Sequence, residues 1–322
     1  MQNTPVLLVT FNRPEYVRRV LSVLRLEQSK ELYIFQDGPR KDVSADVVNC
    51  SQVRSVIREL VDWDCTLHTF FSESNYGCGP GPAAAISWFF DHVEQGIIIE
   101  DDVVPHPDFF QYASELLEKY KDDSSVRAIG SMNVDRQRWG DGSYYFSMMN
   151  RNLCAWAAWK RAWNSFDIEM KGISRHRLSQ ALRKYGCGIL EREYWCDRLD
   201  EVHKDGCDGK SWDMQFFMSI WINHGKGIIP NVNLSSNIGT VGEATHAMTA
   251  GNIIDNVPTA PILPLTHPSD TMVHHEADRQ FHYLYFEPNK KDWKWYQIAY
   301  YIVNKRIKKL VGHQGPWIKR KP

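Results

Sequence analysis

Short apolar runs alternate with amphipathic, helix-like segments through about the first 130 residues of the chain. Runs rich in apolar and β-branched residues predict strands, and they lie at residues 5–11, 31–37, 65–72, 96–100 and 126–132. Apolar residues at helical spacing predict helices, and such segments lie at residues 14–26, 44–63, 81–93 and 106–123. Pro14 suits the first position of the first helix. The alternation predicts an α/β fold with a mostly parallel sheet covered on both faces.

The alternation stops near residue 140. We expect a partly helical Trp-rich segment, a charged helical insertion, a helix capped by Ser211 and stopped by Gly225, and an extended stretch. In order, these segments are residues 153–167, 173–210, 211–225 and 226–239. The pattern predicts one α/β domain over residues 1–270, with halves 1–135 and 136–270, and a separate extension over residues 271–322.

Composition and charge narrow the class of protein. The chain has 322 residues, 43% hydrophobic and 24% charged, which is ordinary for a globular protein. A formal net charge of −1 does not favour nucleic acid as a partner. The N-terminal segment resembles a strand rather than a signal peptide, and the seven cysteines are odd in number and scattered. We therefore expect reduced thiols and a cytoplasmic location.

The C-terminal segment from residue 290 to residue 322 differs from the rest. It carries ten Lys and Arg against the single acid Asp292, a formal charge of +9, and aromatic residues are interleaved with the charges. Two interpretations stay open at this point. The segment is either an interfacial basic helix that holds the protein at an anionic inner membrane surface, or a packing helix with a solvated basic face.

Polar residues follow the first four predicted strands. They are Thr10–Arg13, Gln36–Gly38, Glu73–Gly77 and Glu100–Asp102. Ligands of open parallel sheets bind at the carboxyl ends of the strands, because these ends meet at one edge. The sequence therefore predicts one polar rim that gathers all four segments.

The acidic triplet Glu100, Asp101 and Asp102 follows directly on the apolar run Ile97–Ile99. Adjacent carboxylates repel, and removing them from water is costly. Oxygen ligands at a strand end suit Mn²⁺ or Mg²⁺, usually together with substrate phosphates. In extended backbone, Glu100 and Asp102 share one side and Asp101 faces the other. The plainer alternative is an acidic loop or helix cap before the helix at residues 106–123.

Several segments, read together and in order, carry a resemblance to a known family. They are PVLLVTFNRPEYVRRVL (5–21), IFQDGP (34–39), IIIEDDVVPHPDFFQY (97–112), AWAAWKRAWNSFD (155–167), SWDMQFF (211–217) and GKGIIPNVNLSSNIGTVGEATH (225–246). They resemble the N-acetylglucosaminyltransferase I family and, more closely, bacterial glycosyltransferases of the same GT-A fold that build surface polysaccharides. The resemblance implies a Rossmann-like fold in which residues 1–135 bind a nucleotide-sugar and residues 136–270 form a mixed acceptor side.

The resemblance also implies an activity: a metal-dependent, inverting transfer of a hexose or N-acetylhexosamine, from a UDP-sugar, to a saccharide or lipid-linked acceptor. The implied roles are nucleotide binding by Thr10, Asn12, Arg13 and Asp37, sugar or ribose contact by Glu100, Asp101 and Trp212, Mn²⁺ or Mg²⁺ ligation by Asp102, general base catalysis by Asp213, and diphosphate or metal contact by His246. Arg13 can pair with base or phosphate, and Asp37 can accept the imide N–H of uracil.

Plainer explanations exist for several of these residues. Arg13 can form a surface pair with Glu15, Asp37 can belong to an ordinary turn, and His246 can be a surface histidine. The first turn of a helix favours the ionised form of Asp213, and a carboxylate that is stabilised in this form accepts a proton less readily, which makes Asp213 a weaker base.

Two alternatives to a glycosyltransferase remain, and a zinc site is considered separately from them. A sugar-nucleotide nucleotidyltransferase should carry a Gly-rich loop with a basic residue after the first strand, which residues 11–16 lack. An inactive carbohydrate- or nucleotide-binding protein would bind without turnover. A zinc site would use Cys187, Cys196, His203 and Cys207, but these lack the short paired spacings of zinc ligands.

Overall fold

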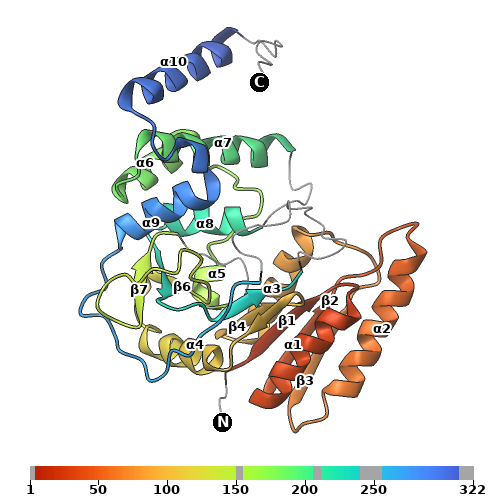
Figure 1. Cartoon of the computed structure of the whole chain (residues 1–322). Coiled ribbons are helices and arrows are strands. Elements are labelled where there is room, and N and C mark those ends of the chain that lie inside the picture. Colours follow the sequence, from red (N-terminus) through yellow and green to blue (C-terminus); the bar gives the residue numbers. More distant parts are fainter. Residues whose placement is uncertain (1–3, 150–154, 206–211, 240–255, 312–322) are drawn as a thin grey trace. The chain divides into compact units, whose positions relative to one another are not determined.

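The structure is a computed structural model that describes residues 4–149, 155–205, 212–239 and 256–311 (Figure 1). Its contacts divide the chain into two compact units, Met1–Arg279 and Gln280–Pro322. The extension expected over residues 271–322 overlaps the second unit. Among the described residues, no helix is long and apolar enough to cross a membrane.

In the described part of the first unit, eight strands form one sheet in the order β3-β2-β1-β4-β8-β6-β9-β7. These strands are β1 Val6–Thr10, β2 Glu31–Gln36, β3 Thr66–Phe71, β4 Gln95–Glu100, β6 Val126–Gly130, β7 Tyr144–Ser147, β8 Trp156–Trp159 and β9 Lys226–Pro230. Two short strands, β5 Val103–Pro105 and β10 Ser235–Asn237, form a separate antiparallel ribbon. The fold is therefore α/β with a largely parallel sheet, as the sequence predicts.

Except for the last, which was not predicted and crosses into the second unit, the described helices that begin in the first unit follow segments predicted to be helical or partly helical. They are α1 Pro14–Glu27, α2 Ser44–Leu60, α3 Pro80–His92, α4 Asp108–Lys119, α5 Lys160–Trp163, α6 Arg175–Lys184, α7 Ile189–Asp205, α8 Asp213–Ile222 and α9 His275–Phe281. Pro14 occupies the first turn of α1, as predicted. The helix expected from Ser211 begins instead at Asp213, with Trp212 at the N-cap position, and Ser211 lies outside the described residues.

The core lies on both faces of the sheet. Every residue of β1 is buried, as are Gly96 to Ile99 in β4, and successive strand side chains point to opposite faces. Both faces must therefore be covered. Helices α1 and α2 lie side by side, and α4 packs over β4, β6 and β8 (Figure 1).

One strand differs from the expectation. The segment expected to be partly helical supplies β8, which pairs antiparallel with β4 and with β6, and only Lys160–Trp163 of this segment is helical. All four residues of β8 are buried. A short apolar run does not distinguish a buried strand from a buried helix by periodicity, because no polar face marks the period. Strand β4 is thus central, with one parallel and one antiparallel neighbour.

The carboxyl ends of the first four strands are level with one another. Thr10 pairs with Gln36, Gln36 with Phe71, and Val9 with Glu100. The predicted common rim is confirmed. The chain moves outward from β1 to β2 and β3 and then returns to the other side of β1 as β4. The order of the strands therefore reverses between β1 and β4, which is where open α/β sheets form a ligand crevice.

The second unit consists of short helical turns and one longer helix. A π-helix covers His282–Phe286, a 3₁₀ turn covers Pro288–Lys290, and α10 covers Trp295–Val311. The Lys290 ammonium lies 4.0 Å from the ring centroid of Tyr301. The rings of Trp293 and Tyr301 meet edge to face at 5.5 Å. These contacts fix one side of α10 against the turn that precedes it.

Candidate functional site

Two turns meet where the strand order reverses. One joins β1 to α1, and the other joins β4 to β5. The Phe11 backbone N–H donates to Asp101 Oδ2 at 3.1 Å. Arg13 Nη1 donates to Asp102 Oδ2, also at 3.1 Å, and forms an ion pair with it. The structure therefore brings Arg13 and the acidic triplet together, as the sequence predicts, and Arg13 pairs with Asp102 in place of the alternative partner Glu15.

The acidic triplet does not keep the strand alternation that the sequence suggests. Glu100 is the last residue of β4, whereas Asp101 and Asp102 form a turn before β5 begins at Val103. The turn sends the carboxylates of Asp101 and Asp102 toward the same β1–α1 connection. The expectation that Asp101 faces away from its neighbours is therefore wrong, because the extended conformation ends at Glu100.

The pKa of each acid of the triplet is raised, chiefly by burial. Burial is the main cause for Glu100, whose pKa rises well above its usual value, and the charges of Asp102, Asp213 and Asp101 add to it. Burial followed by the charge of Asp102 raises the pKa of Asp101 to about 7. Burial also raises the pKa of Asp102, against the opposing effect of Arg13. Among the described residues that shift these pKa values, four are carboxylic acids and one, Arg13, is a cation, so acidic groups outnumber cations there.

Asp102 offers an oxygen atom to a further ligand. Its Oδ1 is buried and has no hydrogen-bond partner among the described residues. A Cβ atom on Gly239 would lie 2.1 Å from Asp102 Oδ2 and 2.7 Å from Asp102 Cγ, so glycine at this position leaves room for the carboxylate. An unsatisfied buried carboxylate oxygen in a negative environment fits a divalent cation.

A cation at Asp102 would need further oxygen ligands. The described residues contain no group of three or more His, Cys, Asp or Glu side chains arranged to hold a metal ion. Mg²⁺ and Mn²⁺ sites commonly use one or two carboxylates and complete their coordination with water and substrate phosphates. The residues therefore fit a cation whose coordination is completed by a diphosphate. They do not form a site that surrounds a cation with protein ligands alone.

The start of α8 reaches the same site. Asp213 is the first residue of α8, and its charge contributes to the raised pKa of Glu100. Asp213 Oδ1 also accepts a hydrogen bond from the Met214 backbone N–H at 2.9 Å. The predicted general base therefore lies within electrostatic reach of the acidic triplet, at the amino end of a helix.

Trp212 occupies a different environment from the sugar platform that the sequence suggests. Only 6% of the residue is exposed. Its indole stacks on Trp156 at 5.7 Å and meets Trp163 edge to face at 6.0 Å. The ring is part of the core beneath the site, because the aromatic residues of β8 and α5 enclose it. In this position Trp212 fixes the start of α8 and hence the place of Asp213.

Thr10 and Asn12 use their side chains within the fold. The Thr10 hydroxyl donates to the Phe35 carbonyl at 3.0 Å and so joins β1 to β2. Asn12 Nδ2 donates to Asp46 Oδ1 at 2.7 Å, which joins the β1–α1 turn to α2. Both residues lie on the predicted rim, and their nucleotide-binding roles remain predictions.

Asp37 holds a loop of the rim in place. Its two carboxylate oxygens accept four hydrogen bonds, from the backbone N–H groups of Gly38, Tyr76 and Gly77 and from Asn75 Nδ2. A carboxylate can accept about four hydrogen bonds, so all the acceptor positions of Asp37 are already occupied. The carboxylate therefore anchors the β3–α3 loop, and a uracil imide would have to replace one of these donors.

One predicted site residue, and one member of the zinc set that the spacing disfavours, cannot be placed. His246 and Cys207 lie outside the described residues. Of the other proposed zinc ligands, Cys187 Sγ lies 3.4 Å from Met148 Sδ, Cys196 Sγ contacts the Arg175 carbonyl oxygen, and His203 Nε2 lies 3.1 Å from the Met170 carbonyl oxygen.

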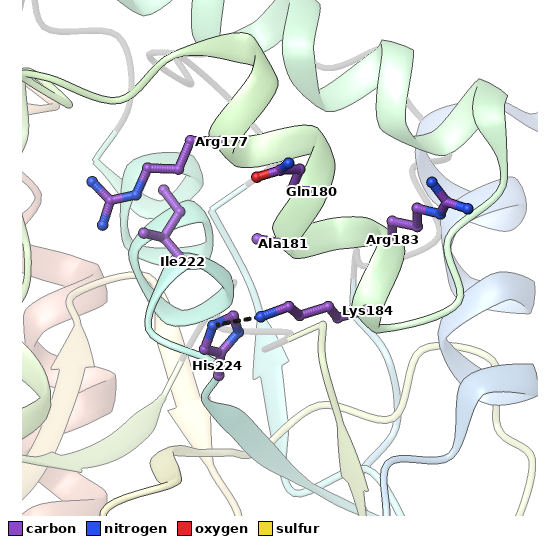
Figure 2. Close-up of a pocket in the computed structure, with 7 residues that line it drawn as sticks. All are labelled: Arg177, Gln180, Ala181, Arg183, Lys184, Ile222 and His224. Atoms are coloured by element: carbon purple, nitrogen blue, oxygen red, sulfur yellow. Dashed lines mark hydrogen bonds between the residues drawn. The ribbon is translucent and has the colours of Figure 1, made fainter.

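An open hollow of about 690 Å³ lies away from these residues, between α6 and the end of α8 (Figure 2). It is lined by Arg177, Gln180, Ala181, Arg183, Lys184, Ile222 and His224. Lys184 Nζ lies 3.2 Å from His224 Nε2, while Arg177 and Arg183 extend in opposite directions from α6. Their charges diverge, so the hollow does not concentrate positive charge on one ligand.

Sequence reasoning missed several residues that support the rim. Asp46 in α2 pairs with Arg40 at 2.7 Å, and Arg40 is the main reason why the pKa of Asp46 is lowered to about 2. Gly239 was also missed, although a glycine shortly after a strand is a signal for close backbone approach. The partners of Asp46 lie in other elements, and no local pattern indicates them.

Comparisons with known proteins identify no family. No protein-family model and no curated protein sequence matches the chain. The chain is similar to solved structures of HddC from Yersinia pseudotuberculosis, with 8% identity and a TM-score of 0.32 over 51% of this chain and 80% of that one. It is also similar to UDP-glucose pyrophosphorylase complexed with UDP-glucose, with 8% identity and a TM-score of 0.38 over 71% and 90% of the two chains.

A third similar structure is a putative glucose-1-phosphate thymidylyltransferase from Bacillus anthracis. It shows 11% identity and a TM-score of 0.30, over 61% of this chain and 83% of that one. At these identities and TM-scores, the likenesses assign no activity to the chain.

Proposed function

We propose that the protein is a glycosyltransferase that binds a nucleotide-diphosphate sugar at the rim between β1 and β4 and transfers the sugar to a hydroxyl group of a saccharide or lipid-linked acceptor. The observation that supports this most is the acidic triplet at the point where the strand order reverses, with Arg13 paired to Asp102 and Asp213 within electrostatic reach of Glu100. A site with excess carboxylate and an unsatisfied Asp102 oxygen suits a cation and the diphosphate that accompanies it.

Asp102 would hold Mn²⁺ or Mg²⁺ through its unsatisfied Oδ1. When bound, the cation neutralises charge that develops on the diphosphate leaving group. Arg13 leaves Asp102 in this state and pairs with a phosphate, for which a guanidinium is well suited. Glu100, at the end of β4, would contact the sugar, and burial together with the charge of Asp102 raises the pKa of its carboxyl.

The transfer itself is a single displacement. The acceptor oxygen forms a bond to the anomeric carbon while the bond from that carbon to the phosphate oxygen breaks, and the nucleoside diphosphate leaves. Asp213 accepts the proton of the acceptor hydroxyl, provided that this hydroxyl comes within hydrogen-bond distance. Attack opposite to the leaving group inverts the anomeric configuration.

The main alternative is a sugar-nucleotide nucleotidyltransferase. The connection from Thr10 at the end of β1 to Pro14 at the start of α1 contains Phe11, Asn12 and Arg13 and no glycine. A pyrophosphate-binding loop needs glycines so that backbone N–H groups can approach the phosphates closely. This short connection favours the glycosyltransferase.

A ligand panel and a product assay test the proposal. Thermal unfolding is measured with each nucleoside diphosphate, with and without Mn²⁺, and hydrolysis of the corresponding nucleotide-sugar is then followed. We expect one base to stabilise the protein in a Mn²⁺-dependent manner. Slow release of that nucleoside diphosphate should be abolished by a chelator and by Asp102→Asn. The matched control is Asp122→Asn, since Asp122 is an exposed acid after α4.

Three results would each reject the proposal. Release of pyrophosphate from a nucleoside triphosphate and a sugar 1-phosphate would identify a nucleotidyltransferase. Mn²⁺-dependent binding with no turnover of any nucleotide-sugar would identify a binding protein. Equal loss of activity in Asp102→Asn and Asp122→Asn would show that the acidic triplet has no special role.

A further inference from the structure

Helix α10 in the second unit exposes a continuous apolar stripe. Tyr296, Tyr300, Val303 and Ile307 are spaced by four, three and four residues, which places them on one face of the helix. Their exposed fractions are 58%, 72%, 55% and 51%. Four large side chains this exposed and this regularly spaced indicate a surface that another molecule covers.

The opposite side of α10 is already occupied. Tyr301 contacts Trp293 and the Lys290 ammonium, and only 7% of Ile302 is exposed. The stripe is therefore not the face by which α10 packs within its own unit. Trp295, at the start of the helix, is 79% exposed but lies on a different side of α10 from the stripe.

The charges around the stripe are all positive. Residues 293–322 contain no Asp or Glu, while the exposed Arg306 and Lys308 flank the stripe on its two sides in the last turns of α10. Two helices that pack against each other are stabilised by opposite charges along the edges of the contact. A second copy of α10 packed on this stripe would instead bring cations against cations. An anionic surface has the complementary charge, and Trp and Tyr are favoured at the boundary between lipid headgroups and acyl chains.

We propose that α10 binds the surface of a membrane rich in anionic phospholipid, with the stripe Tyr296, Tyr300, Val303 and Ile307 inserted at the headgroup boundary. The helix lies along the surface and does not cross it, since no described helix is long and apolar enough to span a bilayer. Arg306 and Lys308, on the two sides of the stripe, then contact lipid phosphates. This interaction does not depend on the chemistry of the rim, so it stands or falls separately from the glycosyltransferase proposal.

Vesicle co-sedimentation of the full chain tests the proposal. Vesicles of phosphatidylcholine alone are compared with vesicles that also contain phosphatidylglycerol. We expect binding to the anionic vesicles that weakens with added salt. The triple variant Tyr300→Ser, Val303→Ser, Ile307→Ser should bind roughly tenfold less or weaker still, because the inserted apolar area is lost.

The matched control is Leu26→Ser, which removes an apolar side chain that is 79% exposed on α1. A second variant, Arg306→Glu with Lys308→Glu, keeps the stripe and should lose preference for the anionic vesicles. Circular dichroism confirms that each variant is folded. Because the changed residues are exposed on the surface, we expect the substitutions to leave the packing of the core and the fold unchanged.

Equal sedimentation of the wild type and the triple variant would overturn the proposal. So would equal binding to neutral and anionic vesicles, since the cations would then have no part in it. If the wild type binds neither kind of vesicle but forms a dimer, and the triple variant is monomeric, the stripe binds a second copy of the chain and the membrane assignment is wrong.

Discussion

Replacing Arg13 with glutamine should strengthen the binding of Mn²⁺ in the absence of a nucleotide. Arg13 Nη1 lies 3.1 Å from Asp102 Oδ2 and is the cation that lowers the pKa of all three acids of the triplet. A divalent ion at Asp102 must therefore compete with the guanidinium. Glutamine removes the positive charge that competes with Mn²⁺ for Asp102. It retains a hydrogen-bond donor, so the turn keeps a polar residue at this position.

The size of the effect follows from the ion pair. At 3.1 Å and an effective dielectric constant of about 20, two unit charges attract each other by about 5 kcal/mol. Arg13 and Asp102 side chains are 23% and 20% exposed, so solvent screens part of this attraction. We expect a net competition of about 1.5 to 3 kcal/mol, which corresponds to roughly 10- to 150-fold in the Kd for Mn²⁺.

Electron paramagnetic resonance measures the free ion directly and needs no turnover. The titration is run at pH 8, because burial and the charge of Asp102 raise the pKa of Asp101 to about 7. At lower pH, protonation would remove the negative charge of Asp101 and weaken the attraction of the site for the cation. In a second titration with saturating Mn²⁺, the variant should bind the nucleoside diphosphate more weakly than the wild type, since its phosphate partner is missing.

Arg18→Gln is the matched control. Arg18 lies on α1, and its guanidinium pairs with Glu59 through two hydrogen bonds of 2.8 and 3.0 Å, away from the triplet. This variant should leave both affinities unchanged. An unchanged Kd for Mn²⁺ in Arg13→Gln would show that the guanidinium does not compete with the cation. Weaker binding of Mn²⁺ would show that Arg13 instead holds Asp102 in its binding position.

Two further predictions concern neighbouring parts of the rim. Gly239→Ala should abolish Mn²⁺ binding with little change in Tm, because the new Cβ would lie 2.1 Å from Asp102 Oδ2; retained binding by calorimetry would contradict the placement of Gly239. Asp46→Asn should lower the free energy of unfolding by about 1 to 2 kcal/mol at pH 7. The pKa of Asp46 is lowered to about 2, chiefly by Arg40, so its contribution exists above the ordinary pKa and fades as the pH falls toward 2. Urea unfolding at pH 7 and at low pH measures both values, and an equal difference between variant and wild type at the two pH values would refute the ion-pair explanation.

The position of the rim could be predicted from the sequence, whereas several contacts within it could not. The pattern of strands and helices implies that the carboxyl ends of β1 to β4 meet, which places Arg13 and Asp102 on one rim but does not predict the ion pair between them. The filled carboxylate of Asp37 depends on a loop that lies 38 to 40 residues further along the chain. The burial of Trp212 depends on Trp156, in a strand that the pattern did not identify. Both outcomes are set by tertiary partners, which hydrophobic periodicity does not encode.

The fold itself explains why three acids can persist at the end of a buried strand. The backbone on each side of the triplet is fixed by a ladder: Ile99 pairs with Leu8 in the main sheet, and Val103 pairs with Asn237 in the β5–β10 ribbon. The Ile238 N–H also donates to the Asp102 carbonyl at 2.8 Å. The acids therefore cannot move apart to relieve their repulsion. Only a proton, a guanidinium or a bound cation can relieve it, and a site that exchanges these three is suited to binding a charged substrate reversibly.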